Sequence, residues 1–261
     1  MQPEPGRVRL VGAGPGAADL LTVRALRAVE GAQALLYDAL VADEVVALAP
    51  AACLKIQTGK RAGRASMRQE TINRLMLRLA RRGLQVVRLK GGDPSVFGRV
   101  GEEAAFLRGH GVEVEVVPGV TAASAAAAQF GFPLTHRGEA RRLLIATASV
   151  RDGALADAGW AQAADPETTL ALYMGRDRIE AALRRLIEHG RSPRTPALAV
   201  ENAGRPDARL LAAPLERLGA EVAAAAFDGP VVVLVGEACA LAQPAARGEV
   251  DPPQPLARRA P

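Results

Sequence analysis

The sequence has little of several features that point to particular classes of protein. It contains only two cysteines, Cys53 and Cys239, which lie far apart and form no C-x-x-C pair, so a disulfide framework is excluded. Its three histidines, His110, His136 and His189, are equally scattered, and no metal-ligand spacing is present. Aromatic residues make up 3% of the chain, which argues against a nucleic-acid binder that stacks bases on aromatic side chains.

Long apolar runs are also missing. No residue between Val116 and Thr135 is charged, but prolines and glycines interrupt this stretch, whereas a membrane-spanning helix needs about 20 strongly apolar residues. The chain begins MQPEPGRVRL, without the basic and then apolar segments of a signal peptide. We therefore expect a soluble, cytoplasmic protein that binds neither membrane nor nucleic acid.

Lysine is scarce, and the positive charge is almost wholly arginine. Only Lys55, Lys60 and Lys90 are lysines, although basic residues outnumber acidic ones by 33 to 28. Arginine pairs with carboxylates and phosphates through two parallel hydrogen bonds, so an acidic partner is one interpretation. A GC-rich genome that favours arginine codons is the other. With 49% hydrophobic and 23% charged residues, the composition is that of an ordinary globular protein and excludes a disordered or fibrous one.

Short β-branched runs alternate with longer helical patterns along the chain. The expected strands are Val8–Val11, Ala34–Tyr37, Val86–Leu89, Val112–Val117, Leu143–Ala146, Thr169–Tyr173, Ala197–Val200 and Val231–Val235. The expected helices are Leu20–Glu30 (with Asp19 as its N-cap), Gln69–Arg82, Gly101–His110, Ile179–His189 and Leu215–Ala225. This alternation predicts an α/β architecture with largely parallel sheets.

The charge-free, alanine-rich stretch after Val117 is the best candidate for a domain boundary. We expect two lobes, residues 1–118 and residues 119–245, on either side of it. The remaining segment, residues 246–261, is rich in Pro, Ala and Arg and has no periodicity, so we expect a disordered tail.

Three glycine-bearing loops follow predicted strands. They are Gly12–Gly16, Gly91–Arg99 and Val117–Ala122. In an open α/β sheet, the loops at the carboxyl ends of the strands meet at the crevice where ligands bind, so we expect these three to form one site. The phosphate-binding pattern G-x-x-x-x-G-K-[ST] is absent, which excludes nucleoside triphosphate hydrolysis.

One of these loops also fits a different function. Residues Gly12–Ala17 match G-x-G-x-x-A, and Asp38 follows the next strand where a ribose-binding acid is expected, so a nicotinamide-dependent oxidoreductase is an alternative. Pro15 argues against it, because proline removes a backbone N–H from the loop that would hold the pyrophosphate. The expected helix start at Asp19 also lies beyond the third small residue of the motif.

Taken together, the motifs resemble a known family. The strings VRLVGAGPGAADLLTVRAL, LLYDALV, TGKRAG, VVRLKGGDPSVFGR, VVPGVTAA, PLTHR and LYMG follow one another between about Val8 and Glu237. They resemble the tetrapyrrole methylases, and YDALV, GKRAG and GGDP-x-VFGR are typical of the branch that methylates uroporphyrinogen III. The resemblance implies the two-lobed α/β fold of the class III methyltransferases, S-adenosylmethionine in the cleft between the lobes, and a homodimer.

The resemblance also implies roles for particular residues. The cofactor contacts fall on Pro15, Gly91, Gly92, Asp93, Val96, Thr121, Ala122, Met174 and Ala203. Asp38 falls on the proton acceptor and Lys60 on the proton donor, although a helix N-cap and a surface lysine are the plainer interpretations of these two. Because uroporphyrinogen carries eight carboxylates, we expect its binding residues among the arginines next to the motifs, namely Arg61, Arg64, Arg99 and Arg137. The motifs imply no metal site.

The activity implied is methylation of uroporphyrinogen III at C2 and C7 to give precorrin-2, with S-adenosylhomocysteine as the second product. Alternatives within the fold are another precorrin methyltransferase, a ribosomal-RNA methyltransferase and a binding module without turnover. The chain departs from the family pattern at Ser95, where an aromatic residue usually follows GGDP, and at Ala146–Ser149, where the family usually has Thr-Gly-His.

Overall fold

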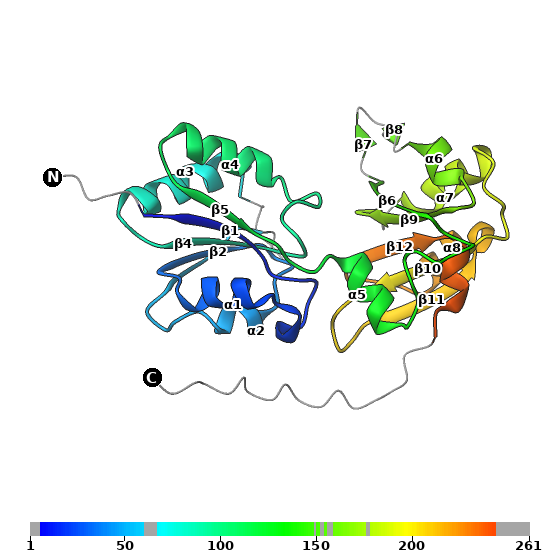
Figure 1. Ribbon diagram of the computed structural model, residues 1–261, viewed down its shortest axis with the longest axis horizontal. Coiled ribbons are helices and arrows are strands. Elements are labelled where there is room, and N and C mark those ends of the chain that lie inside the picture. The colour runs from blue at the N-terminus through cyan, green and yellow to red at the C-terminus, as the bar shows by residue number, and fades with distance from the viewer. Residues whose placement is uncertain are drawn as a thin grey trace.

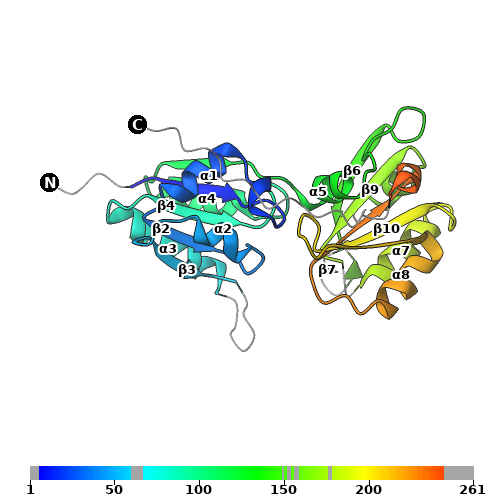
Figure 2. The same ribbon diagram turned by 90° about the horizontal axis from the view of Figure 1, so that it is seen from below.

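The computed structural model describes residues 6–59, 67–148, 150–151, 154–155, 159–175 and 178–243. These residues form two α/β halves, each built on a five-stranded sheet, that lie end to end with α5 (Ala122–Gln129) between them (Figure 1). The view at right angles shows the same separation of the two sheets (Figure 2).

The first sheet is entirely parallel. Its order is β3-β2-β4-β1-β5, from the strands β1 (Val8–Gly12), β2 (Ala34–Tyr37), β3 (Leu54–Gln57), β4 (Val86–Lys90) and β5 (Val114–Val117). One face is covered by α1 (Val23–Glu30) and α2 (Asp43–Ala47), and the other by α3 (Gln69–Arg81) and α4 (Val100–Gly109) (Figure 1). Since both faces are covered, most side chains of the inner strands are apolar on both sides, as in ALLY.

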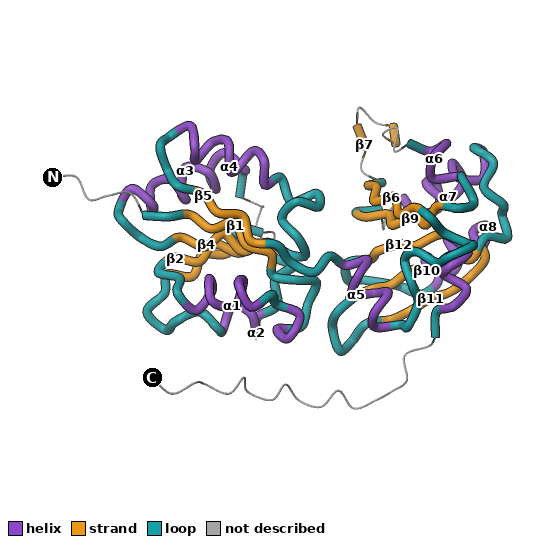
Figure 3. Tube along the Cα trace, viewed as in Figure 1, coloured by secondary structure: helices purple, strands orange, loops and turns teal. Residues whose placement is uncertain are grey.

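The second sheet is mixed. Its order is β11-β10-β12-β9-β6, from the strands β6 (Arg142–Thr147), β9 (Thr168–Tyr173), β10 (Pro196–Glu201), β11 (Arg209–Pro214) and β12 (Val231–Val235) (Figure 3). The helices α6 (Trp160–Ala164), α7 (Ile179–Glu188) and α8 (Leu215–Ala224) pack on one face. The other face is covered by α5 and by the 3-10 helix η3 (Glu237–Leu241). A short ribbon of β7 (Val150–Arg151) and β8 (Ala154–Leu155) stands apart from both sheets.

The prediction of largely parallel sheets is wrong for this second sheet. Only β6 and β9 pair in parallel, whereas β12 runs antiparallel to both β9 and β10. The cause is β11, a strand that the sequence pattern did not indicate. It forms a hairpin with β10 and reverses the chain, so that β12 enters between β9 and β10 in the opposite direction.

The prediction of Asp19 as a helix N-cap is also wrong. Asp19 lies inside a short 3-10 helix, η1 (Ala18–Leu20), and α1 begins only at Val23. Its N-cap is Thr22, whose hydroxyl oxygen accepts a hydrogen bond of 3.1 Å from the backbone N–H of Ala25. The sequence patterns also missed β3, α2, α5 and α6, which are short, exposed or nearly pure alanine.

The strands of the two sheets come from separate stretches of the chain, residues 8–117 and residues 142–235. A domain boundary between residues 118 and 119 stays a prediction, and the predicted tail, residues 246–261, lies outside the described residues. Within the described ranges, every helix is too short or too polar to cross a membrane.

Candidate active site

The three glycine-bearing loops meet at the carboxyl edge of the first sheet, as expected. Gly14 and Gly92 exchange two backbone hydrogen bonds, of 3.2 Å and 2.7 Å. A Cβ atom at Gly12 would lie 2.6 Å from the amide nitrogen of Gly119 and 2.7 Å from the carbonyl oxygen of Gly92. Only glycine at position 12 allows the backbones of the three loops to approach this closely.

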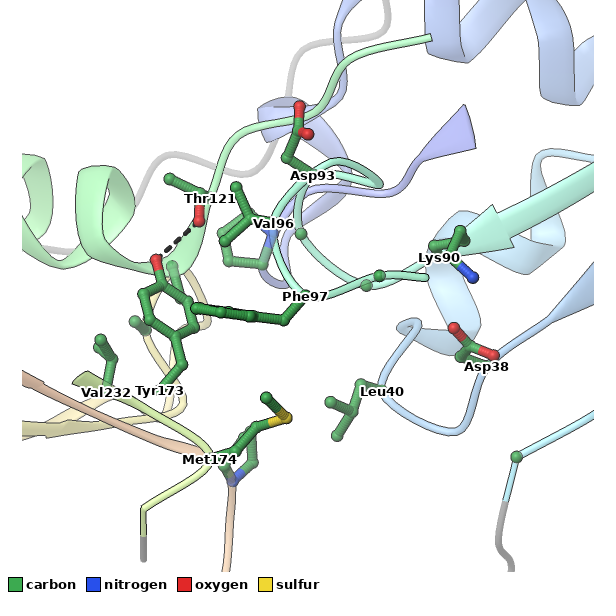
Figure 4. Close-up of a pocket in the computed structure, with 18 of the residues that line it drawn as sticks. Asp38, Leu40, Lys90, Asp93, Val96, Phe97, Thr121, Tyr173, Met174 and Val232 are labelled. Carbon is green, nitrogen blue, oxygen red and sulfur yellow. Dashed lines mark hydrogen bonds between the residues drawn. The ribbon is translucent and has the colours of Figure 1, made fainter. Parts of the chain in front are cut away.

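The loops form the floor of a cleft of about 740 Å³, a volume suited to a small organic ligand. Residues from both halves of the molecule line this cleft. They include all nine positions predicted to bind the cofactor: Pro15, Gly91, Gly92, Asp93, Val96, Thr121, Ala122, Met174 and Ala203. Figure 4 shows Asp38, Leu40 and Lys90 at one end of the cleft, and Thr121, Tyr173 and Val232 at the other.

Direct contacts hold the two halves together around the cleft. The backbone N–H of Ala17 donates a 2.8 Å hydrogen bond to the carbonyl of Gly204, in the turn between β10 and β11. From the same turn, the Nη2 atom of Arg205 donates to the carbonyl of Leu40, also at 2.8 Å. The cleft is therefore a property of the assembled molecule rather than of either half.

Asp93 binds within its own loop system. One carboxylate oxygen accepts hydrogen bonds from the backbone N–H and the hydroxyl of Ser95, and the other accepts from the backbone N–H of Gly119 at 2.9 Å. Burial acts to raise the pKa of Asp93, but these hydrogen bonds outweigh it and leave the pKa below its ordinary value. This carboxylate therefore joins the second glycine loop to the third, and its predicted contact with the cofactor stays a prediction.

The lining also includes apolar side chains in unusual backbone conformations. Met174 has a φ of +54° and a residue exposure of 59%, which is high for a methionine. Phe97 has a φ of +55°, and its ring packs against that of Tyr173. Such conformations cost free energy outside glycine, and they place both side chains at the cleft rather than in a core.

Asp38 belongs to a buried group of charged side chains that the sequence patterns did not reveal. Its carboxylate accepts hydrogen bonds from Nη2 of Arg88 and from the hydroxyl of Thr58. On the other side of Arg88 lies Glu103, whose Oε1 atom is 3.3 Å from Nε of Arg88. Both oxygens of Glu103 are 3.1 Å from Nζ of Lys90.

We refer to Asp38, Arg88, Lys90 and Glu103 as the charge cluster. Burial lowers the pKa of Lys90, and the neighbouring guanidinium of Arg88 adds to this effect, while Glu103 and Asp38 oppose it. One feature of the sequence could have indicated the charge cluster: the strand VVRLK carries two basic residues and is otherwise apolar. A buried strand that carries two cations needs buried anions opposite them.

The predicted substrate-binding arginines are only partly brought to the cleft. Arg99 lines it and forms an ion pair with Glu102, its Nη2 atom 2.7 Å from the carboxylate. Arg137 is exposed, in the turn bounded by His136 and Ala140, and is not part of the cleft lining. The other predicted residues, Lys60, Arg61 and Arg64, lie outside the described residues. No group of three His, Cys, Asp or Glu side chains that could hold a metal ion occurs in the described ranges.

Comparison with known proteins assigns the chain to a family. The model of the Tetrapyrrole (Corrin/Porphyrin) Methylases matches residues 7–219. This chain belongs to the tetrapyrrole methylase family. It is 46% identical to the uroporphyrinogen-III C-methyltransferase of Paracoccus denitrificans, over 91% of this chain and 83% of that one. It is also 43% identical to the siroheme synthase of Methylococcus capsulatus, over 92% of this chain and 51% of that one.

The fold agrees with that assignment. The crystal structure of uroporphyrin-III C-methyl transferase from Thermus thermophilus complexed with S-adenyl homocysteine matches with a TM-score of 0.75 and 43% identity, over 89% of this chain and 93% of that one. The two-lobed tetrapyrrole methylase fold expected from the sequence is confirmed. The chain spans about half the length of the siroheme synthases that it matches.

The dinucleotide-binding interpretation of Gly12–Ala17 does not hold for this tetrapyrrole methylase. That motif requires a helix N-terminus directed at the pyrophosphate, but α1 begins six residues after Ala17, beyond η1. The acid expected to bind a ribose, Asp38, is engaged by Arg88 instead.

Proposed function

We propose that this chain is an S-adenosylmethionine-dependent C-methyltransferase that methylates uroporphyrinogen III at C2 and C7, giving precorrin-2. The observation that carries the proposal is the cleft, because all nine expected cofactor positions and Asp38 line one continuous space. Relatives named uroporphyrinogen-III C-methyltransferase and siroheme synthase support the same substrate.

The residues present suit such a cofactor. A Cβ atom at Gly91 would lie 3.2 Å from Cβ of Leu40, so the absence of a side chain keeps this part of the cleft open for a ligand. Met174, Val96 and Val232 offer apolar surface, and a methionine sulfur makes favourable contacts with aromatic rings such as adenine. When bound, S-adenosylmethionine supplies an electrophilic methyl group on its sulfonium sulfur, and the product is S-adenosylhomocysteine.

The chain's own residues are proposed to accept and donate protons and to bind the carboxylates of the substrate. A pyrrole carbon of the substrate becomes methylated, and a proton must leave the macrocycle to restore conjugation. We propose Asp38 as the acceptor of that proton, since its side chain is 32% exposed and it lines the cleft. Lys60 is the proposed proton donor, and Arg61, Arg64, Arg99 and Arg137 are proposed to bind the substrate carboxylates.

The experiment is anaerobic incubation with uroporphyrinogen III and S-adenosylmethionine, followed by mass spectrometry of the tetrapyrrole. Two added methyl groups are expected. A single methyl group would contradict the double methylation, and unmodified uroporphyrinogen from a chain that binds S-adenosylhomocysteine would point to another precorrin substrate or to a binding module. Asp38→Asn is the matched variant, and normal turnover in it would refute the proton-acceptor role.

We also propose that the enzyme is a cytoplasmic homodimer, as its family implies. Sedimentation equilibrium of the purified chain tests the dimer, and a monomer at micromolar concentration would contradict it. The product suits the siroheme pathway named for several relatives, and cobalamin or haem d1 synthesis are the alternatives.

A further inference from the structure

We infer that Arg88, held in place by Glu103 and Lys90, is a positioning residue for Asp38 that fixes the direction of this carboxylate. The inference rests on the proposed function, in which Asp38 accepts the proton that leaves the substrate. It adds residues of β4 and α4 to a site so far described by its loops.

The geometry of Arg88 leaves its side chain little freedom. Arg88 lies in the middle of β4, the central strand of the first sheet, and its side chain is 3% exposed. Nη2 donates to Asp38, Nε donates to Glu103, and Nη1 donates to the carbonyl of Leu89 at 3.3 Å. All three nitrogens of the planar guanidinium therefore have a partner, which fixes the fork that meets Asp38.

Glu103 is the anchor of this arrangement. Its side chain is 0% exposed, and it comes from the first turn of α4, on the face that packs against the sheet. Besides Arg88 and Lys90, the Oε1 atom accepts a 3.0 Å hydrogen bond from Nε2 of Gln69 in α3. Helices from the same side of the sheet thus hold Glu103 and, through it, Arg88.

The charges in the cluster balance. Arg88 and Lys90 carry two positive charges, and Glu103 and Asp38 carry two negative ones. Because Lys90 binds both oxygens of Glu103, it neutralises the anion that would otherwise compete with Asp38 for the guanidinium. Arg88 can therefore keep its hydrogen bond to Asp38, at the edge of the cleft, while it also binds Glu103.

Stability alone does not explain why these charges are buried. Removing charged groups from water costs several kcal/mol for each ion, and well-packed apolar residues at such positions are often equally stabilising. The cluster lies where the first sheet meets the cleft, because Asp38, Arg88 and Lys90 all line it. Figure 4 shows Asp38 and Lys90 there. A positioning role for the proton acceptor accounts for this location.

The charge cluster also predicts a dependence of activity on pH. Among the described residues, Arg88 donates a hydrogen bond to Asp38, Lys90 interacts with it electrostatically, and Glu103 contacts both cations. From the other half, Arg205 reaches the carbonyl of Leu40. In general, loss of a nearby cation disfavours the charged form of a carboxylate, and loss of a nearby anion favours it. A proton acceptor works only in its ionised form, so kcat/KM falls towards acid pH. This fall, the acid limb of the profile, moves to higher pH when a cation is lost and to lower pH when an anion is lost.

In the reaction the proton balance is simple. The bond from sulfur to the methyl carbon breaks as the bond from the methyl carbon to the pyrrole carbon forms, and the positive charge of the sulfonium passes to the macrocycle. A proton leaves the macrocycle for Asp38, and the partly exposed carboxyl returns it to solvent. Arg88, Lys90 and Glu103 take part only by holding Asp38, and they exchange no proton themselves.

The test compares Lys90→Met, Glu103→Gln and the double variant. We expect the acid limb of kcat/KM against pH to move to higher pH in Lys90→Met and to lower pH in Glu103→Gln. The double variant removes one charge of each sign, so we expect its acid limb to return close to that of the wild type. Glu70→Gln, in an exposed ion pair with Arg74 on α3, is the matched control and is expected to leave the profile unchanged.

A further variant separates orientation from charge. Arg88→Lys keeps the positive charge but loses the fork, so we expect kcat to fall about tenfold with KM nearly unchanged. Binding of S-adenosylhomocysteine by calorimetry shows that each variant retains a folded cleft.

The outcomes distinguish the two proposals. If the wild-type chain does not methylate uroporphyrinogen III, the proposed function fails. If the wild type is active, and a folded Glu103→Gln that binds S-adenosylhomocysteine keeps the wild-type acid limb, the positioning role fails even where Lys90→Met does not fold. Shifts of the same sign in Lys90→Met and Glu103→Gln would likewise overturn it, because a general loss of stability has no such dependence on charge.

Discussion

Phe97 and Tyr173 come from opposite halves of the molecule, and their rings pack against each other (Figure 4). The ring centroids are 5.6 Å apart, and the angle between the ring planes is 52°. The hydroxyl of Tyr173 also lies 2.6 Å from Oγ1 of Thr121 and accepts a 2.9 Å hydrogen bond from the backbone N–H of Ala123. One side chain at the end of β9 therefore connects the second glycine loop, the third loop and the start of α5.

Removal of that hydroxyl tests its part in shaping the cleft. In Tyr173→Phe the ring contact with Phe97 stays, but Thr121 and the N–H of Ala123 lose their partner. We expect the affinity for S-adenosylhomocysteine to fall about fivefold, the effect of about one net hydrogen bond. Isothermal titration calorimetry measures this change. Unchanged affinity would mean that the hydroxyl does not hold the lining in place.

The close approach of the loops predicts different results for two glycines. Gly12→Ala forces Cβ against the backbones of Gly119 and Gly92, so we expect a lower melting temperature and loss of S-adenosylhomocysteine binding. Gly101→Ala, in the first turn of α4, is the control, because no atom beyond its chain neighbours and its own helix backbone lies within 4 Å of a Cβ at this position. Equal melting temperatures for the two variants would contradict this account of the loops.

The depressed pKa of Asp93 predicts a pH-dependent contribution to stability. A carboxyl group with a lowered folded-state pKa stabilises the protein above its unfolded pKa of about 3.9, and this contribution disappears as the pH falls through the lower folded value. In Asp93→Asn, either orientation of the amide directs its NH₂ at one of the N–H groups that the carboxylate now accepts from.

We therefore expect Asp93→Asn to melt at a lower temperature than the wild type at pH 7, with a difference that narrows as the pH falls below about 4. Thermal unfolding at several pH values measures this. The exposed Asp43→Asn serves as a control and is expected to show a small difference at every pH. A difference that widened in acid would show that the charge of Asp93 is not the cause.

Arg205 predicts a role for the contact between the two halves. Its guanidinium reaches the carbonyl of Leu40, two residues after Asp38, and its side chain packs against Gly16. In Arg205→Met we expect KM for S-adenosylmethionine to rise about threefold to tenfold, because one charged hydrogen bond across the cleft is lost. Arg184→Met, on the exposed surface of α7, is the matched control. Initial-rate kinetics measure KM for S-adenosylmethionine in both variants. Equal KM values would show that Arg205 has no part in cofactor binding.

The meeting of the glycine loops could be predicted because it follows from local features of the sequence. Gly12 is the last residue of β1, while Gly92 and Gly119 follow β4 and β5, and parallel strands bring their carboxyl ends to one edge. The strands and helices with strong periodicity, such as α3 and β12, were also predicted to within one or two residues.

The charge cluster and the sense of the second sheet were not predictable in the same way. Glu103 has the sequence context of a solvent-exposed acid in a first helical turn, and only the packing of α4 on the sheet buries it against Lys90. β11 is an edge strand with no clear alternation, so its hairpin with β10 is visible only in the pairing. In both cases the deciding interactions join residues whose contact depends on tertiary structure.

The hydrogen bond from Ala17 to Gly204 also bears on how the protein folds. Its two residues are separated by most of the chain, and closing so long a loop is among the slower steps of folding. During synthesis, the first sheet is complete long before the turn that contains Gly204 leaves the ribosome. A nascent chain therefore acquires its ligand-binding cleft last, and binding of a labelled S-adenosylhomocysteine would report the end of folding rather than the formation of the first sheet.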